Sequence, residues 1–364
     1  MSDKAILYVN GKIYEGWKEV EIKRSLKAAS GSFSMSITDR WSGQNAPWII
    51  APGDAAEVRI GADVLITGYV DTVSSSMDKD ARNISVSGRD KTADIIDCSV
   101  VSKTGEYANV TLLSLAQNLC APFGISVAAS QSTGAAFEVF KVQQGEAVFE
   151  ALDRAARKRG FLLTSDTKGG LFITRPGSTR SNTRLQQGEN IKVASSTFDS
   201  KERFSEYIVK GQDSGFTNEV DPAFAYAVKA SAKDPTVARY RPLVIQSEQL
   251  TSIGDAKTRA GWEATTRAAK SGKFNITVQG WRQGDGSLWQ PNQLILAYAD
   301  WIGLNGEMLV TDVSYSLTSE QGTICVLSLE RKDAYLPEPS VPEKTDPLAQ
   351  AIKKDPGFKK ANAR

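Results

Sequence analysis

The feature that most constrains the fold is a pattern of alternating apolar and polar residues that occurs twice in this chain of 364 residues. The first copy reads GSFSMSITDRW (residues 31–41), and the second reads GKFNITVQGWR (residues 272–282). Strict alternation that is rich in aromatic and β-branched residues is typical of a strand with one buried face and one solvated face. We therefore expect two similar sheets to form much of the core.

The correspondence between the two copies extends along the chain at a constant offset of 241 residues. Residues 65–90 and 307–333 both follow the order strand, polar turn, strand, within one residue of that offset. Residues 1–103 and 201–334 are thus predicted to be two related antiparallel β-barrel domains, the second with an added helix. The pairs related by the offset are Phe33 and Phe274, Met35 and Ile276, Ile37 and Val278, Trp48 and Trp289, and Ser87 and Ser328.

The segment between the copies has a different pattern, which predicts a small α+β domain over residues 104–200. Apolar residues recur at helical spacing from Leu112 to Leu119 and again from Val148 to Ala156, where Gly160 predicts the helix end. Residues 335–364 contain five prolines and few core residues, so we expect an extended C-terminal tail. The predicted fold class is mainly β with an α+β insertion.

Composition argues against several kinds of chemistry. The chain has 44 basic and 42 acidic residues, so its total charge does not predict electrostatic binding to DNA or to an anionic membrane. It has no histidine, and its three cysteines lack paired spacings, so neither a metal nor a cofactor is expected. The N-terminus lacks the order of a signal peptide, and no run of about twenty apolar residues occurs, which predicts a cytoplasmic product without membrane insertion.

Two patterns raise the possibility of catalysis, and both are better explained structurally. Ser76 and Lys79 have the spacing of a β-lactamase-like nucleophile and its neighbour, but they lie in a predicted turn rather than at a helix start. Glu146, Glu150 and Asp153 share a predicted helix, where surface acids are common. We predict no catalytic residue. The tryptophans are similarly interpreted as core or subunit contacts rather than as a base-stacking surface.

The order of elements and the sequence VQQGEAVFEALDRAARKRGFLLTSDTKGGLFITRPG (residues 142–177) resemble the baseplate hub proteins of contractile-tailed phages, in particular the Mu-like tail protein P family. The resemblance implies a structural protein of the virion tail baseplate, present in the host cytoplasm during assembly. It implies a homotrimeric ring in which two β-barrels per chain give pseudo-six-fold symmetry. The implied partners are the spike protein, the tail tube and other baseplate proteins, with DNA only passing through the central channel.

The resemblance also suggests why the pattern occurs twice, since three chains with two similar β-domains each offer six similar faces to a six-fold tube. Two other functions stay open at this point: a tail-associated cell-wall-degrading enzyme, and a β-barrel protein that binds single-stranded nucleic acid. In the tail, apolar residues among lysines suggest an arm that orders on a partner. The candidate partner-binding residues are Leu348, Ile352, Lys353, Lys354 and Phe358.

Overall fold

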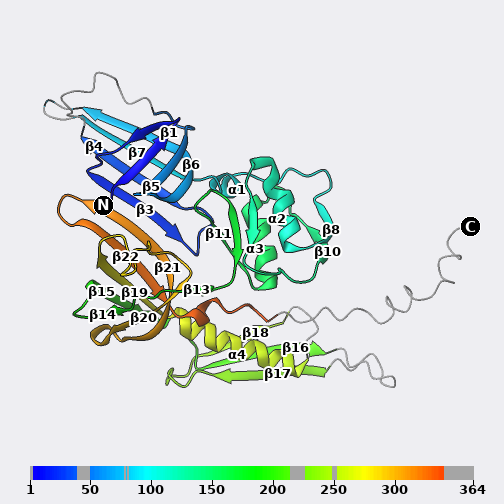
Figure 1. Ribbon diagram of the computed structural model, residues 1–364. Helices are drawn as coiled ribbons and strands as arrows, with labels where there is room; N and C mark the ends of the chain where they lie inside the picture. The colour runs from blue at the N-terminus through cyan, green and yellow to red at the C-terminus, as the bar shows by residue number, and fades with distance from the viewer. Residues whose placement is uncertain are drawn as a thin grey trace, which may run out of the picture. The chain divides into compact units, whose positions relative to one another are not determined.

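The computed structural model describes residues 3–38, 50–77, 79, 82–213, 226–247 and 252–339. The described chain forms two compact units (Figure 1). The first comprises residues up to Arg203 together with Thr265–Glu338, and the second is formed by Phe204–Ala264. A mainly β fold with a small helical insertion is confirmed.

The first unit begins with a tight antiparallel hairpin of β1 (Ala5–Val9) and β2 (Lys12–Tyr14). Asn10 and Gly11 connect the strands with φ angles of 50° and 76°. A two-residue hairpin turn of this kind needs positive φ at both positions, which asparagine and glycine tolerate best. The Asn-Gly pair thus sets the register of the first two strands.

Two sets of four strands have the same pairing order. In the first set β4 pairs with β7, β7 with β6 and β6 with β5, all antiparallel. In the second set β19 pairs with β22, β22 with β21 and β21 with β20, also antiparallel. The strands are β4 (Ser32–Thr38), β5 (Ala55–Ile60), β6 (Asp63–Met77) and β7 (Arg82–Asp90), then β19 (Gly272–Gln279), β20 (Gln293–Ala299), β21 (Leu304–Thr318) and β22 (Gly322–Glu330).

The two sets also share their register. Phe33 lies opposite Gly88, and Phe274 lies opposite Leu329. The offset of 241 residues relates Gly88 to Leu329, as it relates Phe33 to Phe274. Each set has one irregularity in its central pair, after Val70 in β6 and after Val310 in β21. Since a slip of one residue would turn every side chain to the other face, this shared register keeps the same positions buried in both sets.

Two further strands extend the sets. β3 (Glu19–Ser25) pairs with β4, and β15 (Ile191–Phe198) pairs with β19 in the equivalent place. β3 also pairs with β21, so both sets belong to one sheet of 14 strands. β15 falls before residue 201, where the sequence placed the start of the second β-domain. Its polar sequence, with three consecutive Ser and Thr residues, gives only a weak strand pattern.

The segment between the sets forms its own core. Its helices α2 and α3 pack together with strands of two small sheets, β8 with β10 and β9 with β11 and β12. The Thr111 side chain accepts a hydrogen bond from the Ser114 amide at the start of α2, and Gly160 ends α3 with φ 69°. The elements are α1 (Ala93–Asp97), β8 (Glu106–Val110), α2 (Leu112–Cys120), η1 (Ala121–Phe123), β9 (Val127–Ala129), β10 (Phe137–Lys141), α3 (Val148–Arg159), β11 (Leu162–Ser165) and β12 (Leu171–Thr174). The short strands β13 (Thr179–Arg180) and β14 (Leu185–Gln186) then pair with β20.

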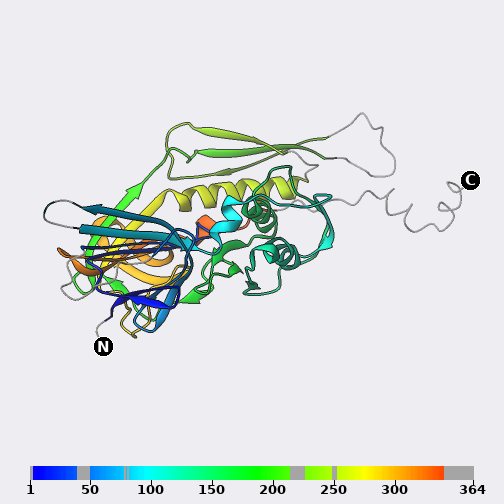
Figure 2. The ribbon, with the colours of Figure 1, turned by 90° about the horizontal axis from the view of Figure 1, so that it is seen from above.

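The second unit is a three-stranded sheet beside a helix (Figure 2). Ala256 and Ala260 of the helix pack against Val209 and Val228 of the sheet. The sequence prediction assigned this segment to the second β-domain, but its central strand β16 pairs only with β17 and β18 among the described residues. Its elements are β16 (Glu206–Asp213), β17 (Tyr226–Lys233), β18 (Pro242–Gln246) and the first part of α4 (Ile253–Lys270). The short η3 (Lys332–Tyr335) follows β22 in the first unit, and η2 (Asp300–Ile302) precedes β21.

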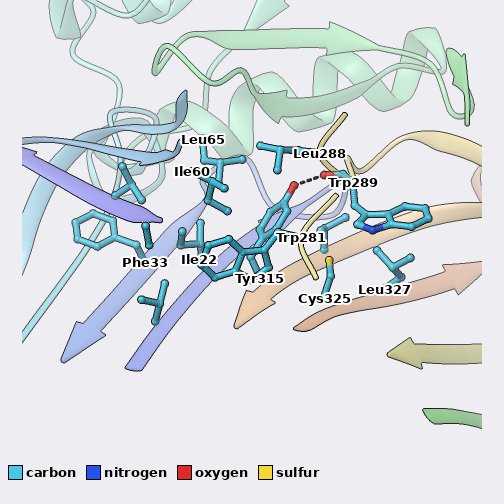
Figure 3. Packing of buried hydrophobic residues seen from close by; sticks show 14 of the residues in the cluster. Ile22, Phe33, Ile60, Leu65, Trp281, Leu288, Trp289, Tyr315, Cys325 and Leu327 are labelled. Carbon is cyan, nitrogen blue, oxygen red and sulfur yellow. Dashed lines mark hydrogen bonds between the residues drawn. The ribbon is translucent and has the colours of Figure 1, made fainter. Parts of the chain in front are cut away.

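Both strand sets contribute to one hydrophobic core (Figure 3). Trp281 and Tyr315 are among its largest fully buried side chains, and Ile22 and Phe33 of the first set belong to the same cluster. The Tyr315 hydroxyl donates a hydrogen bond to the Trp289 carbonyl, which satisfies a polar group inside this core. The core therefore binds the two sets to each other.

We expect Phe33→Ala and Phe274→Ala to lower the free energy of unfolding by similar amounts, about 3–5 kcal/mol each, because both rings are buried at equivalent register positions. Phe198→Ala is the control, since Phe198 is 65% exposed and its loss should cost the isolated chain under about 1 kcal/mol. Denaturant unfolding of the three variants measures these costs. A cost below about 1 kcal/mol at either core position would contradict the equivalence.

Candidate assembly site

The joint between the two strand sets is a backbone ladder between β3 and β21. It runs from Ser25 opposite Asp312 to Val20 opposite Leu317. In the middle, Ile22 and Tyr315 face each other in the core, while the neighbouring pair of Lys23 and Ser314 faces outward. The alternation of each strand thus produces one apolar and one polar face at the joint.

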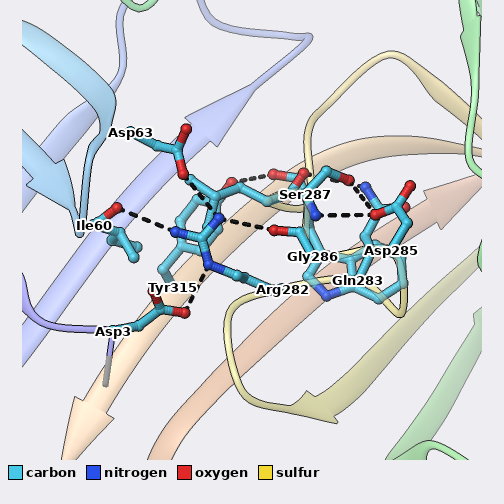
Figure 4. Close-up of polar contacts among 11 residues, drawn as sticks. Asp3, Ile60, Asp63, Arg282, Gln283, Asp285, Gly286, Ser287 and Tyr315 are labelled. Atoms are coloured by element: carbon cyan, nitrogen blue, oxygen red, sulfur yellow. Dashed lines mark hydrogen bonds and ion pairs between the residues drawn. The ribbon is translucent and has the colours of Figure 1, made fainter. Parts of the chain in front are cut away.

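A charged clamp lies beside this joint (Figure 4). Arg282, in the loop after β19, donates to Asp3 at 2.8 Å and to Asp63 at 2.8 Å, and it also reaches the Gly286 carbonyl at 2.9 Å. The hydrogen bond to Asp3, followed by that to Asp63, raises the pKa of Arg282. Asp63 begins β6 of the first set, and Asp3 precedes β1, which pairs with β5 of that set. The clamp therefore ties the loop of the second set to the first set and to the strand beside it.

A buried polar cluster attaches the middle segment to the sheet. Asp90 at the end of β7 is 1% exposed and accepts hydrogen bonds from the Gly31 amide at 2.7 Å and the Ser165 hydroxyl at 2.6 Å. Arg24 of β3 donates to the Ser165 carbonyl at 3.0 Å. Burial raises the pKa of Asp90, against the lowering effect of these hydrogen bonds and of Arg24. The cluster fixes the end of β11 against β3 and β7.

Asn292 makes a second attachment with the chain that leaves the middle segment. It has φ 69°, and its side chain accepts from the Gly177 amide at 2.7 Å. Its amide group donates to the Arg175 carbonyl at 3.0 Å and the Ser178 hydroxyl at 2.9 Å. One residue before β20 therefore holds the whole turn after β12.

The residues that raised the possibility of catalysis have structural surroundings. Ser76 is exposed near the end of strand β6 and not at a helix start. Glu146 accepts from Arg154 at 2.9 Å and from the Gln143 amide at 2.8 Å. Burial raises the pKa of Glu146, but these hydrogen bonds outweigh burial, so the pKa lies below its ordinary value.

The sequence predicted one helix for all three acids, but Glu146 lies in the loop before α3, and only Glu150 and Asp153 lie in the helix. Glu150 accepts from the Ala147 amide at the helix start, and Asp153 pairs with Arg157 one turn later at 2.7 Å. These contacts stabilise the helix ends and surface. Among the described residues, no group of three or more His, Cys, Asp or Glu side chains is arranged to hold a metal ion. Burial raises the pKa of the Cys120 thiol to about 12.

The structure describes three of the four repeat-related positions Phe33, Trp48, Phe274 and Trp289. Phe33, Phe274 and Trp289 are buried in the shared core. Trp48 lies outside the described residues, as do the candidate tail residues Leu348, Ile352, Lys353, Lys354 and Phe358. The sequence analysis did not single out Arg282 or Asp90. Their partners are far away in the sequence, so no local spacing could have indicated them.

A solved structure at 38% identity places the chain in the class of prophage tail proteins. A 43 kDa tail protein of prophage MuSo2 from Shewanella oneidensis is 38% identical, with a TM-score of 0.81, and the match covers 92% of this chain and 100% of that one. A tail protein from Neisseria meningitidis MC58 has the same fold at 23% identity and a TM-score of 0.73, covering 93% of this chain and 99% of that one. No helix among the described residues is long and apolar enough to cross a membrane.

The sequence comparisons identify the family. Residues 4–90 match the N-terminal domain of the Mu phage baseplate assembly protein GpP-like family, residues 92–175 match the second domain of gp44-like baseplate hub proteins, and residues 252–338 match the fourth domain of GpP. The baseplate hub protein gp44 of Escherichia phage Mu is 36% identical over 92% of this chain and 90% of that protein. The chain belongs to this family of phage tail baseplate hub proteins, which confirms the resemblance.

We expect Glu146→Gln to lower the free energy of unfolding by about 1–3 kcal/mol at pH 7, because it removes the charge from a partly buried, hydrogen-bonded pair. A carboxyl with a lowered pKa in the folded state stabilises above its unfolded pKa, and this stabilisation is lost as pH falls through the folded pKa. The difference from the parent chain should therefore shrink as the pH drops below about 4.

Denaturant unfolding at several pH values measures this difference. Glu150→Gln, four residues further along, in α3, is the matched control, and its cost should be smaller since Glu150 makes a single 3.3 Å bond to a backbone amide. A Glu146→Gln cost that stays constant from pH 7 to pH 3 would rule out the proposed charge pairing.

Proposed function

We propose that three copies of this chain close into a ring with pseudo-six-fold symmetry that joins the tail tube to the central spike. The observation that carries the proposal is that the two strand sets have the same pairing order and the same register, with an irregularity at the same place in the central pair of each set. Three chains with two such sets each would present six similar faces. A ring of this kind adapts a three-fold spike to a six-fold tube.

The relatives support a place between tube and spike. The gp44 protein of phage Mu is named a baseplate hub protein. A structure with the same fold at 11% identity is described as a component of a type VI secretion system that is similar to the phage T4 tail proteins gp27 and gp5. We accordingly propose the spike, the tube and neighbouring baseplate proteins as partners, in the virion and, during assembly, in the host cytoplasm. DNA would only pass through the central channel.

We further propose that the chain has no enzymatic activity of its own. The acids first considered for catalysis are held in capping or ion-pair contacts at α3, and Ser76 lies on a strand rather than at a helix start. A cell-wall-cleaving function would need a positioned acid or nucleophile. Trp281 and Trp289, two of the described tryptophans, are buried, which leaves these two unavailable for stacking on bases, whereas Trp301 is exposed.

Size-exclusion chromatography with light scattering tests the ring directly. We expect a mass of about three times 39.4 kDa at micromolar concentration in moderate salt. The measurement should be repeated over a tenfold range of concentration, because a weak ring dissociates on dilution. A clean monomer throughout that range would count against self-assembly of the hub.

We also propose that residues 340–364 act as an arm that binds a neighbouring hub subunit or baseplate protein. Deleting these residues should leave the number of subunits in the ring unchanged but reduce its incorporation into tails. Replacing Leu348, Ile352 and Phe358 by Ser should have the same effect if apolar contacts hold the arm. Lys353→Gln with Lys354→Gln is the matched control, with a smaller effect expected of rim charges. Normal yields of infectious particles from the truncated gene would show that the arm is dispensable.

A further inference from the structure

Two strand edges of the first unit have no partner among the described residues. β5 pairs with β6 only as far as Tyr69, so the far half of β6, Thr72–Met77, pairs with β7 on one side alone. The equivalent half of β21, Asp312–Leu317, pairs with β3 on that side. β15 likewise pairs with β19 on one side and with no described strand on the other.

The two open edges carry exposed apolar side chains. Met77 in β6 is 74% exposed, and Phe198 in β15 is 65% exposed. An open edge with apolar side chains is a template for pairing with another chain, and soluble proteins usually protect such an edge. These edges are therefore candidates for contact with a second copy.

We propose that β15 of one chain pairs antiparallel with Thr72–Met77 of a second copy, in the register of the internal joint between β3 and β21. The proposal rests on the proposed ring and specifies its subunit interface.

The register follows from the positions that correspond in the two sets. Ser196 lies opposite Phe274 as Ile22 lies opposite Phe33, so Ser196 is the counterpart of Ile22. The offset of 241 residues relates Ile84 to Cys325. Ser75 lies opposite Ile84, and Tyr315 lies opposite Cys325, so Ser75 is the counterpart of Tyr315. Since Ile22 pairs with Tyr315, Ser196 is placed opposite Ser75 of the second copy.

This register matches apolar with apolar and polar with polar residues. On the face that corresponds to the core, it places Phe198 opposite Val73 and Ala194 opposite Met77. On the outer face it places Thr197 opposite Ser74 and Ser195 opposite Ser76. A shift by one residue would bring the apolar side chains of one strand opposite polar side chains of the other.

The backbone of β15 is directed correctly for this pairing. The Asp199 amide donates to the Ser271 carbonyl at 2.8 Å, toward β19. Because amides alternate along an antiparallel strand, those of Phe198, Ser196 and Ala194 point to the open edge. β3 is arranged in the same way at the internal joint, where the Leu26 amide donates to the Thr311 carbonyl at 2.7 Å.

The interface joins different surfaces of the two copies, so each chain has one edge of each kind. A head-to-tail contact of this type generates a closed ring when its rotation closes. The internal joint and the subunit joint would then alternate around the ring. All strand edges at these joints would be paired, which removes the exposed edges.

Disulfide cross-linking tests the register. Ser74 and Thr197 would form a pair without hydrogen bonds between them, with Cα atoms roughly 4.5 Å apart, within the range that a disulfide spans. A chain carrying Ser74→Cys and Thr197→Cys, with Cys98→Ser to remove the exposed native thiol, should form covalent oligomers under mild oxidation. Each single cysteine variant should stay uncross-linked on a non-reducing gel.

Val193→Cys in place of Thr197→Cys is the matched control. Val193 is exposed on the same face of β15 as Thr197. Because it lies four residues before Thr197, it would be about 13 Å from the position opposite Ser74. Cross-linking of Thr197→Cys and not of Val193→Cys supports the pairing. An oligomer of unchanged mass without this cross-link would overturn the strand pairing and leave the ring intact, whereas a monomer at every concentration would overturn both.

A proline substitution gives an independent readout. Ser196→Pro removes an amide that points to the open edge and leaves the hydrogen bonds from β15 to β19 in place, so the chain should fold with an unchanged circular dichroism spectrum. Its mass should fall to that of a monomer, while Ser196→Thr keeps the oligomer. A folded Ser196→Pro variant that remains fully oligomeric would also overturn the pairing.

Discussion

The backbone ladder between β3 and β21 is the contact on which the rest of the first unit depends. Without it, the chain would have two separate small sheets, each with an open edge and a partial core. With it, the strands form one sheet, and Ile22 and Trp281 belong to one hydrophobic cluster. Small β-domains gain little stability by themselves, because their buried fraction is low. Fusing two of them provides a larger core.

The polar contacts around this ladder explain why the joint keeps one geometry. Hydrophobic burial has no direction, but hydrogen bonds between charged groups do. Arg282 holds Asp3 and Asp63, and Arg24 and Asp90 meet at Ser165 of the middle segment. These acidic and basic side chains position the elements around the joint. This use fits a structural protein of a phage tail baseplate.

The two strand sets have diverged in side chains while keeping their pairing. Opposite Phe33 stands Gly88, where an added Cβ would lie 2.7 Å from the Phe33 ring and 2.1 Å from the Tyr69 carbonyl oxygen. Opposite Phe274 stands Leu329, which is fully buried. Core volume is thus distributed differently in the two sets. What both keep is the alternation that decides which face is buried.

The sequence by itself determined the local structure, because local structure depends on residues close together in the chain. Asn10 and Gly11 form a hairpin, α2 and α3 lie where apolar spacing predicted helices, and Phe33 and Phe274 occupy buried faces as alternation requires. The helix-hairpin sequence was also enough to suggest the family.

Only the tertiary structure decided how these elements combine. The alternation in Glu19–Ser25 cannot specify that β3 pairs with β21, about 290 residues away, since many strands present a similar edge. The polar strand β15 is identified by its pairing with β19, and Phe204–Ala264 forms a separate unit by its own contacts. The Arg282 clamp depends on two acids that lie near the other end of the chain. Such contacts form when both strand sets are buried together. Patterns of neighbouring residues in the sequence do not predict them.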